Sequence, residues 1–356
     1  MPYKVLAINP GSTSTKIAVY EDDKPIFNET LRHSAEELAP FARITDQFDF
    51  RKDVIEQCLE KAGIHVKTLN AIIGRGGLFK PIPSGTYEVN AAMMNYIKAG
   101  TGGDHASNLG CLIADDIARD AGVKSYIVDP VVVDELNPLA RYSGLPEIPR
   151  RSILHALNQK AVARRASREL GKKYEELNLI VVHLGGGISI GMHEKGKVVD
   201  VNNALNGDGP FAPERAGGLP TGDLVKMCFS GKYTIDEINK KLAGKGGCVS
   251  HLGTNDGREM EERVKAGDAT TALVVEAMAY QVSKTIGEMA TVVNGKVDAI
   301  VLTGSFAYFK KFVEWITERV SWIAKVLVYP GEDEMTALAE AGFRILRGEE
   351  QAREYK

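Results

Sequence analysis

The 356-residue sequence lacks the cysteine and histidine patterns that mark disulfide-rich and zinc-binding proteins. Its four cysteines are widely separated and form no C-x-x-C pair: Cys58, Cys111, Cys228 and Cys248. Seven histidines are present, but none follows H-E-x-x-H or another zinc spacing. The scattered thiols favour reduced side chains in a cytoplasmic protein over a disulfide framework.

Long apolar runs and a strong excess of charge are also absent. No apolar run approaches the roughly 20 residues that a membrane-spanning helix needs. The first residues lead into an apolar stretch rather than a charged-then-apolar leader. The net charge is only -3, so nothing steers the chain toward nucleic acid or an anionic membrane. With 44% apolar and 26% charged residues, a globular protein of two ordinary domains is expected.

The most informative stretch is N-P-G-S-T-S-T-K at residues 9–16, which lies between the apolar runs 5–8 and 17–20. Both runs have the pattern of strands, so the polar stretch is predicted to be the turn of a hairpin. Gly11 allows a close backbone approach, and backbone N–H groups, hydroxyls and Lys16 together can form an anion site. A P-loop is not matched, because threonine precedes the lysine and a strand follows it. The motif predicts a phosphate site between antiparallel strands, with a ligand-free polar turn as the alternative.

A similar arrangement recurs in the second half of the chain. The apolar strand pattern 179–184 runs into three glycines at 185–187, and two further strand patterns follow at 188–192 and 197–201. This repeat of strand, polar turn and strand suggests a duplicated domain. The Rossmann pattern G-x-G-x-x-G is not matched, because position 190 is isoleucine and a strand follows instead of a helix. A tight glycine hairpin without a ligand is the alternative.

The rest of the chain shows alternating strand and helix patterns. Further strands are expected at 26–30, 71–73, 86–89, 125–128, 298–303 and 325–329. Helices are expected at 51–62, from Asn90, from Ser107 as the cap to Gly122, and at 152–170, 221–229, 235–242, 269–293 and 334–346. The proline-containing segment 131–151 is the expected crossing between domains. Segment 202–223 is expected to be a long irregular loop, and loops of that length within a compact domain are usually functional or disordered. The charged tail 347–356 is expected to fray.

Four polar residues lie at the ends of predicted elements. Arg75 stands between glycines after a strand, and Asp129 follows an apolar strand, where α/β sheets bind ligands. His155 lies in the first turn of a predicted helix, and His183 lies near the end of a predicted strand. A solvated arginine, a turn aspartate, a helix-face histidine and a core histidine are the corresponding structural alternatives.

These stretches, taken in order, resemble the acetate kinase and butyrate kinase family, which belongs to the superfamily of sugar kinases, actin and the heat-shock chaperone ATPases. The similarity extends from residue 5 to about residue 346 and is greatest to butyrate kinases and branched-chain fatty-acid kinases. It is carried by the segments 9–16, 104–110, 128–131, 183–187 and 208–215.

The fold that this resemblance implies is α/β. Two similar actin-like (ribonuclease H-like) domains would contain mixed sheets, with a nucleotide cleft between them. The expected domains are 1–135 with 335–356, on the acid and phosphate side, and 136–334, on the nucleotide side. The family also implies a homo-oligomer, at least a dimer.

The resemblance implies a reversible transfer of the γ-phosphoryl group from ATP to a short-chain fatty acid, giving an acyl phosphate and ADP. Butyrate is the expected acid, and isobutyrate or isovalerate is the alternative. A carboxylate with a pKa of about 4–5 is already ionised at pH 7, so the reaction needs no general base. The obstacle is repulsion between this anion and the triphosphate, which positive charge, Mg²⁺ and alignment must overcome.

Residues that match the family's nucleotide and metal positions occur in both halves. Asn9 and Glu334 are expected to help to hold Mg²⁺, partly through water. A lysine and two hydroxyls of the first turn are expected to line the phosphates: Ser12, Ser14 and Lys16. The second turn and two later positions are expected to contact the nucleoside and phosphates of ADP: Gly185, Gly186, Gly187, Asp256 and Gly304.

Four residues match the family's catalytic positions. Arg75 is expected to meet the substrate carboxylate or the moving phosphoryl group, since its planar fork suits both. Asp129 is expected to orient metal or substrate. His155 and His183 are expected to donate hydrogen bonds to the phosphoryl oxygens during transfer.

The chain departs from acetate kinases at three positions. Gly186 replaces an asparagine of the second turn, and Pro220 replaces the second active-site arginine. Arg215, a few residues earlier in the same loop, is the expected substitute. Ser305 stands where many relatives have a second glycine. Butyrate-type kinases share the first two departures, which favours an acid of four or five carbons.

Two other functions are compatible with parts of this pattern. A sugar kinase of the same superfamily would need a general base for a neutral hydroxyl, and Asp129 could serve. A nucleotide-gated regulatory or chaperone-like protein would generally carry an added peptide-binding or DNA-binding module, and none is apparent. The carboxylate kinase is therefore the preferred interpretation.

Overall fold

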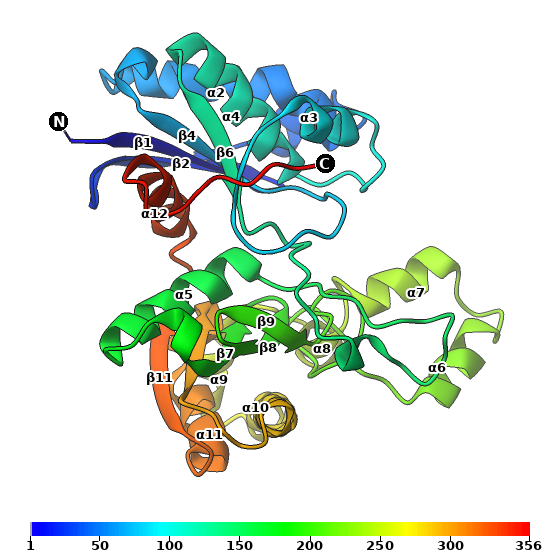
Figure 1. Ribbon diagram of the computed structural model, residues 1–356. Helices are drawn as coiled ribbons and strands as arrows, with labels where there is room; N and C mark the ends of the chain where they lie inside the picture. Colours follow the sequence, from blue (N-terminus) through cyan, green and yellow to red (C-terminus); the bar gives the residue numbers. More distant parts are fainter. Residues whose placement is uncertain (1) are drawn as a thin grey trace. The chain divides into compact units, whose positions relative to one another are not determined.

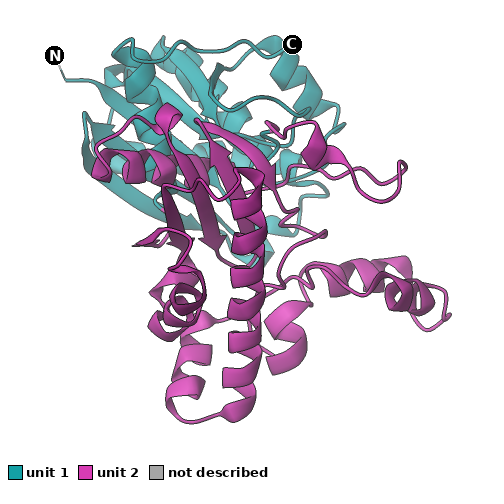
Figure 2. Ribbon diagram, turned by 60° about the horizontal axis from the view of Figure 1, so that its bottom comes forward, with its two compact units in different colours: residues 1–133, 333–356 teal, residues 134–332 magenta. Residues whose placement is uncertain are grey.

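The computed structural model describes residues 2–356, which divide into two compact units. One unit contains the chain up to Val133 together with Asp333–Lys356, and the other contains Asp134–Glu332 (Figure 2). The chain thus crosses to the second unit and returns, so that its last helix belongs to the first unit. The nucleotide cleft expected between the domains stays a prediction.

The first unit is built on a mixed sheet in the order β3-β2-β1-β4-β6-β5. Its strands are β1 (Lys4–Pro10), β2 (Ser14–Glu21), β3 (Lys24–Arg32), β4 (Ala71–Arg75), β5 (Thr86–Glu88) and β6 (Lys124–Val128). The first three strands pair antiparallel, whereas β4 runs parallel to β1, and β6 runs parallel to β4. The predicted hairpin and the predicted strands of this half are confirmed.

Helices cover both faces of this sheet (Figure 1). On one face lie α2 (Phe48–Lys61), α3 (Ala91–Lys98) and α4 (Asn108–Ala121), and α12 (Glu334–Leu346) lies on the other. A short helix, α1 (Ala35–Leu38), follows β3. Because side chains alternate along a strand, Leu6 and Ile8 of β1 join one apolar cluster, while Val5 meets Gly342 of α12 on the opposite face. Burial on both faces explains why β1 reads as a continuous apolar run.

The second unit repeats the first. Its sheet has the order β11-β10-β7-β8-β9, with β7 (Asn178–Leu184), β8 (Ile188–Glu194), β9 (Lys197–Val201), β10 (Ala299–Gly304) and β11 (Lys325–Pro330). Again three consecutive strands pair antiparallel and two later strands add in parallel. Strands β7, β8, β9, β10 and β11 therefore correspond to β1, β2, β3, β4 and β6, which confirms the predicted duplication and the α/β class with mixed sheets.

Helices also flank the second sheet. α5 (Ala156–Glu169) packs on β7 and β10, and the long α10 (Ala269–Val292) packs on β8 and α11 (Lys310–Val320). Four shorter helices lie between β9 and α10: α6 (Thr221–Cys228), α7 (Ile235–Leu242), α8 (Gly247–Leu252) and α9 (Gly257–Lys265). No helix within the described residues 2–356 is long and apolar enough to cross a membrane.

The predicted start of α5 is wrong, whereas Ser107 is the N-cap residue of α4 as predicted but does not cap it with its side chain. α5 begins at Ala156 with His155 as its N-cap, not at Ser152, because the Ile153 carbonyl accepts a hydrogen bond from the Ala204 N–H (3.0 Å) instead of continuing a helix. Ser107 precedes α4, but its hydroxyl does not cap the helix. Its backbone is already helical (φ -62°, ψ -20°), whereas a capping side chain needs an extended residue.

The expectation of a frayed C-terminal tail is also wrong. Arg353 pairs with β5: its N–H donates to the Thr86 carbonyl (2.8 Å), and its carbonyl accepts from the Glu88 N–H (3.1 Å). The Tyr355 ring is 4% exposed and lies 5.5 Å from the ring of Phe79. A buried aromatic side chain and added backbone pairing therefore hold the tail. Helices α8, α9 and α11 were not predicted from the sequence.

Candidate functional site

The first predicted phosphate-binding turn connects β1 to β2. The Gly11 N–H donates to the Ser14 carbonyl (2.7 Å) and closes the turn. Ser12 and Thr13 are exposed at its tip, and Lys16 is exposed at the start of β2. Hydroxyls, backbone N–H groups and a cation thus lie at one end of a hairpin, an arrangement that can bind an anion.

Three predicted site residues of the first unit form one hydrogen-bonded cluster. Asn9 lies near the end of β1, Arg75 ends the neighbouring parallel strand β4, and Glu334 is the first residue of α12. The Asn9 amide Nδ2 donates to Glu334 Oε2 (2.6 Å), and Arg75 Nη1 lies 3.2 Å from both Asn9 Oδ1 and Glu334 Oε2. The N-terminus of α12 favours the negative charge of Glu334. The sequence predicted these residues separately, and the topology brings them together.

Asp129 follows β6 in a strained backbone conformation. Its φ is +38°, in the left-handed region that residues other than glycine rarely occupy. The carboxylate is buried, and its Oδ1 accepts hydrogen bonds from the Ser84 hydroxyl (2.6 Å) and the Gly85 N–H (2.9 Å). Residues held in such a conformation concentrate at functional sites. Ser84 was not predicted from the sequence, and it joins the site through its hydrogen bond to Asp129.

His105 lies in one of the motifs that carried the family resemblance. Its Nδ1 contacts the Ser107 hydroxyl (2.7 Å), which is therefore not available to cap α4. Burial and the positive charge of Arg75 lower the pKa of His105. A neutral imidazole near Arg75 avoids repulsion between two cations in this part of the first unit.

The second predicted turn, Gly185–Gly187, connects β7 to β8. A Cβ at Gly185 would lie 2.9 Å from His183 Nε2, so this position admits only glycine without a shift of the histidine. His183 Nδ1 contacts Asn158 Oδ1 (2.8 Å) and Nε2 lies 3.1 Å from Glu332 Oε1. The carboxylate of Glu332 and the amide oxygen of Asn158 both accept hydrogen bonds, so each ring nitrogen of His183 faces an acceptor. Neither Asn158 nor Glu332 was predicted from the sequence.

The two predicted histidines lie together in the second unit. The rings of His155 and His183 are stacked, with centroids 3.7 Å apart and an interplanar angle of 10°. His155 Nδ1 contacts the Ser189 hydroxyl (2.9 Å) of β8. Gly187 is adjacent, since a Cβ there would lie 3.7 Å from His155 Cε1. The stack therefore fixes two imidazoles beside the glycine turn.

Arg215 lies at the same turn. A Cβ at Gly187 would lie 3.5 Å from Arg215 Nε, and the Glu214 N–H donates to the Gly186 carbonyl (3.1 Å). The buried Nε of Arg215 has no hydrogen-bond partner among the described residues. A buried donor without an acceptor is costly, and an anionic ligand would supply one. The structure thus places the predicted substitute arginine beside His155 and the second turn.

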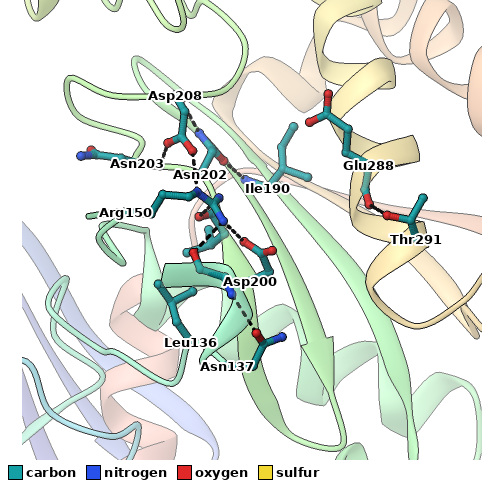
Figure 3. Close-up of polar contacts among 12 residues, drawn as sticks. Leu136, Asn137, Arg150, Ile190, Asp200, Asn202, Asn203, Asp208, Glu288 and Thr291 are labelled. Carbon is teal, nitrogen blue, oxygen red and sulfur yellow. Dashed lines mark hydrogen bonds and ion pairs between the residues drawn. The ribbon is translucent and has the colours of Figure 1, made fainter. Parts of the chain in front are cut away.

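The loop that carries Arg215 is fastened to the sheet (Figure 3). Arg150 Nε donates to Asp208 Oδ2 (3.1 Å), and its Nη1 donates to Asp200 Oδ1 (2.9 Å) of β9. Asn202 Nδ2 lies 3.4 Å from the Asp208 carbonyl, and its Oδ1 accepts from the Ile190 N–H (2.7 Å) of β8. These bonds explain how a long loop without regular structure can hold a side chain in a defined place.

A cavity of about 560 Å³ lies at the start of α9. It is lined by Gly186, Asn255, Asp256, Gly257, Arg258, Glu261, Ser305, Phe306, Tyr308 and Phe309. Asp256 caps α9 by accepting from the Arg258 N–H (2.8 Å). An aromatic wall, a helix N-terminus and a glycine of the second turn suit an aromatic base with attached phosphates. The sequence predicted Asp256, but not Arg258 or the aromatic residues.

Gly304 is required by its backbone conformation. Its φ is +92°, and a Cβ would lie 2.2 Å from the Leu184 carbonyl oxygen at the end of β7. The Gly304 and Gly331 backbones also exchange two hydrogen bonds (3.1 and 2.9 Å). Gly304 therefore joins the ends of β7, β10 and β11 next to Ser305, which lines the cavity.

Known proteins resemble this chain in sequence and in fold. The model of the acetokinase family matches residues 147–316. Butyrate kinase 1 of Clostridium acetobutylicum is 58% identical over 354 residues, covering 99% of this chain and all of that protein, and butyrate kinase 2 of the same organism is 55% identical over the full length of both. The chain belongs to the acetokinase family. The acetate kinase structure from Porphyromonas gingivalis, at 20% identity, covers 97% of the chain with a TM-score of 0.79 and shares its fold.

The predicted residues thus fall into separate groups within the two units of this acetokinase-family chain. The first unit brings together Asn9, Arg75 and Glu334, and the second brings together His155, His183, Gly187 and Arg215. Asp129 contacts Ser84 and Gly85. Within residues 2–356, no group of three His, Cys, Asp or Glu side chains is arranged to hold a metal ion.

Proposed function

We propose that this chain is a butyrate kinase, which transfers the γ-phosphoryl group of ATP to butyrate and catalyses the reverse reaction. The full-length identity of 58% to butyrate kinase 1 is the observation that carries this proposal. The geometry supports it, because each unit has a glycine-containing hairpin turn with cationic or hydrogen-bond-donating side chains beside it. The first unit would serve the acid and the phosphates, and the second the nucleotide.

The proposed chemistry needs positioning and charge more than proton removal. The butyrate carboxylate is ionised at pH 7 and can attack the phosphorus directly. Arg75 would pair with the carboxylate or the phosphoryl oxygens through its planar fork. In the second unit, His155, His183 and the Nε–H of Arg215 are donors that could stabilise negative charge on the transferring group.

Mg²⁺ is part of this proposal. Asn9 Oδ1 and Glu334 are oxygen ligands of the kind that Mg²⁺ prefers, and one carboxylate plus waters and substrate phosphates is its usual environment in kinases. The residues therefore fit the ion. Bound there, Mg²⁺ would neutralise part of the phosphate charge. Asn9 and Glu334 would orient it, and Arg75, now bonded to both, would be released toward the substrate.

The assay that tests the function traps acyl phosphate with hydroxylamine. The purified protein, ATP, Mg²⁺ and butyrate should yield a coloured hydroxamate, and isobutyrate, isovalerate and acetate should be compared as acceptors. Faster turnover of a branched acid would make the chain a branched-chain fatty-acid kinase. Phosphorylation of hexoses without hydroxamate formation would favour a sugar kinase with Asp129 as base. ATP binding without any product would indicate a regulatory protein.

A homodimer in the cytoplasm completes the proposal. The arm formed by residues 219–242, which includes α6 and α7, leaves Phe229 87% exposed and Ile235 77% exposed. Large exposed apolar side chains on one segment are typical of an interface. If the two copies of α7 pack antiparallel across a two-fold axis, the acidic first turn of each would also face the basic last turn of the other.

The dimer can be tested by light scattering during gel filtration. The wild-type protein should have twice the chain mass, and Phe229→Asp should shift it toward the monomer. Trp322→Asp, at a side chain 79% exposed elsewhere in the second unit, is the control and should leave the mass unchanged. A monomeric wild type would refute the dimer and leave the kinase proposal standing.

A further inference from the structure

Arg51 is a fully buried arginine that lies beneath the first turn. It belongs to α2 and has no exposed surface. Its Nη1 donates to the Gly11 carbonyl (2.7 Å), and its Nη2 donates to the Ser12 carbonyl (2.8 Å). Nη1 also lies 3.2 Å from the Ser14 carbonyl and 3.1 Å from the Thr15 hydroxyl. One guanidinium thus contacts every position from Gly11 to Thr15 except Thr13.

The charge of Arg51 has no carboxylate partner among the described residues. Its other contact is the Gln47 amide oxygen, which accepts from Nε (3.0 Å) and Nη2 (2.8 Å), so every acceptor is neutral. Burial lowers the pKa of Arg51, yet an arginine remains protonated at neutral pH. Buried cations are usually paired with an acid. Here a positive charge is left uncompensated directly behind a turn that is proposed to bind phosphate.

The same contacts set the direction of the backbone N–H groups. In a trans peptide the carbonyl and the following N–H point in opposite directions. Because the carbonyls of Gly11 and Ser12 point at Arg51, the N–H groups of Ser12 and Thr13 point away from it. The Thr13 carbonyl accepts from the His33 N–H (2.9 Å) instead of from Arg51. Successive outward N–H groups form an anion-binding concavity.

We propose that Arg51 is a positioning residue for nucleotide binding: it turns the N–H groups of Ser12 and Thr13 toward the phosphates of ATP and places a positive charge behind them. This inference rests on the proposed function, but it assigns a role to a side chain that does not touch the nucleotide. It also explains why an unpaired arginine is buried there. Bound phosphate is the anion that compensates its charge.

The test is steady-state kinetics of Arg51→Gln and Arg51→Lys, with ATP and butyrate varied separately. Arg51→Gln should raise KM for ATP by about tenfold or more, since it removes a charge and the contacts with the carbonyls of Gly11, Ser12 and Ser14. Its KM for butyrate should stay within about twofold. Arg51→Lys keeps the charge without the fork and should lie between Arg51→Gln and the wild type. Titration with ADP should show the same order of Kd values.

A matched control separates this role from a general loss of stability. Arg344→Gln removes a half-buried ion pair to Glu350 in the same unit (2.8 Å) and should lower Tm without changing KM for ATP. The proposal is refuted if Arg51→Gln folds and keeps KM for ATP and Kd for ADP within twofold of the wild type. If Arg51→Gln does not fold, the same criterion applies to Arg51→Lys. Failure of the kinase proposal is a different result, in which the wild type makes no acyl phosphate. The Kd values for ADP of the wild type and the Arg51 variants then still decide the role of Arg51.

Discussion

Arg215 offers the sharpest test of how the second unit would stabilise a transferring phosphoryl group. Arg215→Ala removes the guanidinium beside Gly187 and His155, while the backbone bridge between residue 215 and Ala243 is kept. Loss of one donor to the transition-state charge should lower kcat by roughly 10²–10³-fold, which corresponds to about 3–4 kcal/mol. KM for butyrate should change far less, because the interaction is stronger in the transition state than in the ground state.

The structure also predicts what this change does to stability. The Arg215 side chain donates no hydrogen bond to the described residues, so its removal leaves no acceptor unpaired, and Tm should stay within a few degrees of the wild type. The hydroxamate assay gives kcat and a thermal scan gives Tm. Arg319→Ala, which breaks an ion pair to Glu276 (2.7 Å), is the control and should leave kcat unchanged. A folded Arg215→Ala enzyme with kcat within threefold of the wild type would remove Arg215 from the site.

Three further predictions concern stability, each measured as the free energy of unfolding in denaturant. Burial, Lys160 and Arg164 hold the pKa of fully buried His193 well below 6.5, so the unfolded chain takes up a proton first as the pH falls. This lowers stability below pH 6.5 by up to about 1.4 kcal/mol per pH unit, and His193→Gln should flatten the slope by that amount; an unchanged slope would contradict the assignment. Gly295→Ala should lower the free energy of unfolding by roughly 1–3 kcal/mol, because alanine is strained in the left-handed conformation. Gly304→Ala should lower it by clearly more, because its Cβ would also collide with the Leu184 carbonyl oxygen, whereas a Cβ at Gly295 meets no atom. Tyr355→Ala should cost about 2–4 kcal/mol and the exposed Glu354→Ala almost nothing; equal effects would indicate that the tail does not stabilise the unit.

The elements that the sequence predicted well are those determined by local pattern. Continuous apolar runs bounded by glycine or polar turns located β1 and β7, because their side chains are buried on both faces. The α12 helix was predicted with its observed bounds, since its apolar residues follow the helical period. The tail was mispredicted, because the partners of Tyr355 lie 265 and 275 residues earlier in the chain, as its hydrogen bonds with Asn90 and Lys80 show.

The candidate site was only partly predictable for a related reason. Polar residues at strand ends, such as Arg75 and Asp129, stand out against apolar runs. Residues that act through those side chains do not, because Glu332 and Ser84 read as ordinary loop residues until the fold brings them into contact. Arg51 did leave a signal, since it lies four residues before Ile55 on the buried face of α2. A charged residue at such a position is a sign of a specific polar partner.

The duplication places different side chains at equivalent positions of the two units. Val5 pairs with Ala71 as Leu179 pairs with Ala299, so counting four residues along each first strand makes Asn9 and His183 equivalent. α12 packs on β1 and β4, and α5 packs on the equivalent strands β7 and β10. The first turn of each helix supplies the contact: Glu334 of α12 contacts Asn9, and Asn158 of α5 contacts His183.

The chemistry at these equivalent positions differs between the units. An amide and a carboxylate offer oxygen ligands to a cation, whereas an imidazole held by an amide offers an N–H donor to an anion. With this division, Asn9→His should raise the Mg²⁺ concentration that gives half-maximal activity. His183→Asn should lower kcat and leave that Mg²⁺ concentration unchanged. Titrating activity against Mg²⁺ at saturating ATP compares the two variants, and identical responses would show that the two strand ends have not specialised in this way.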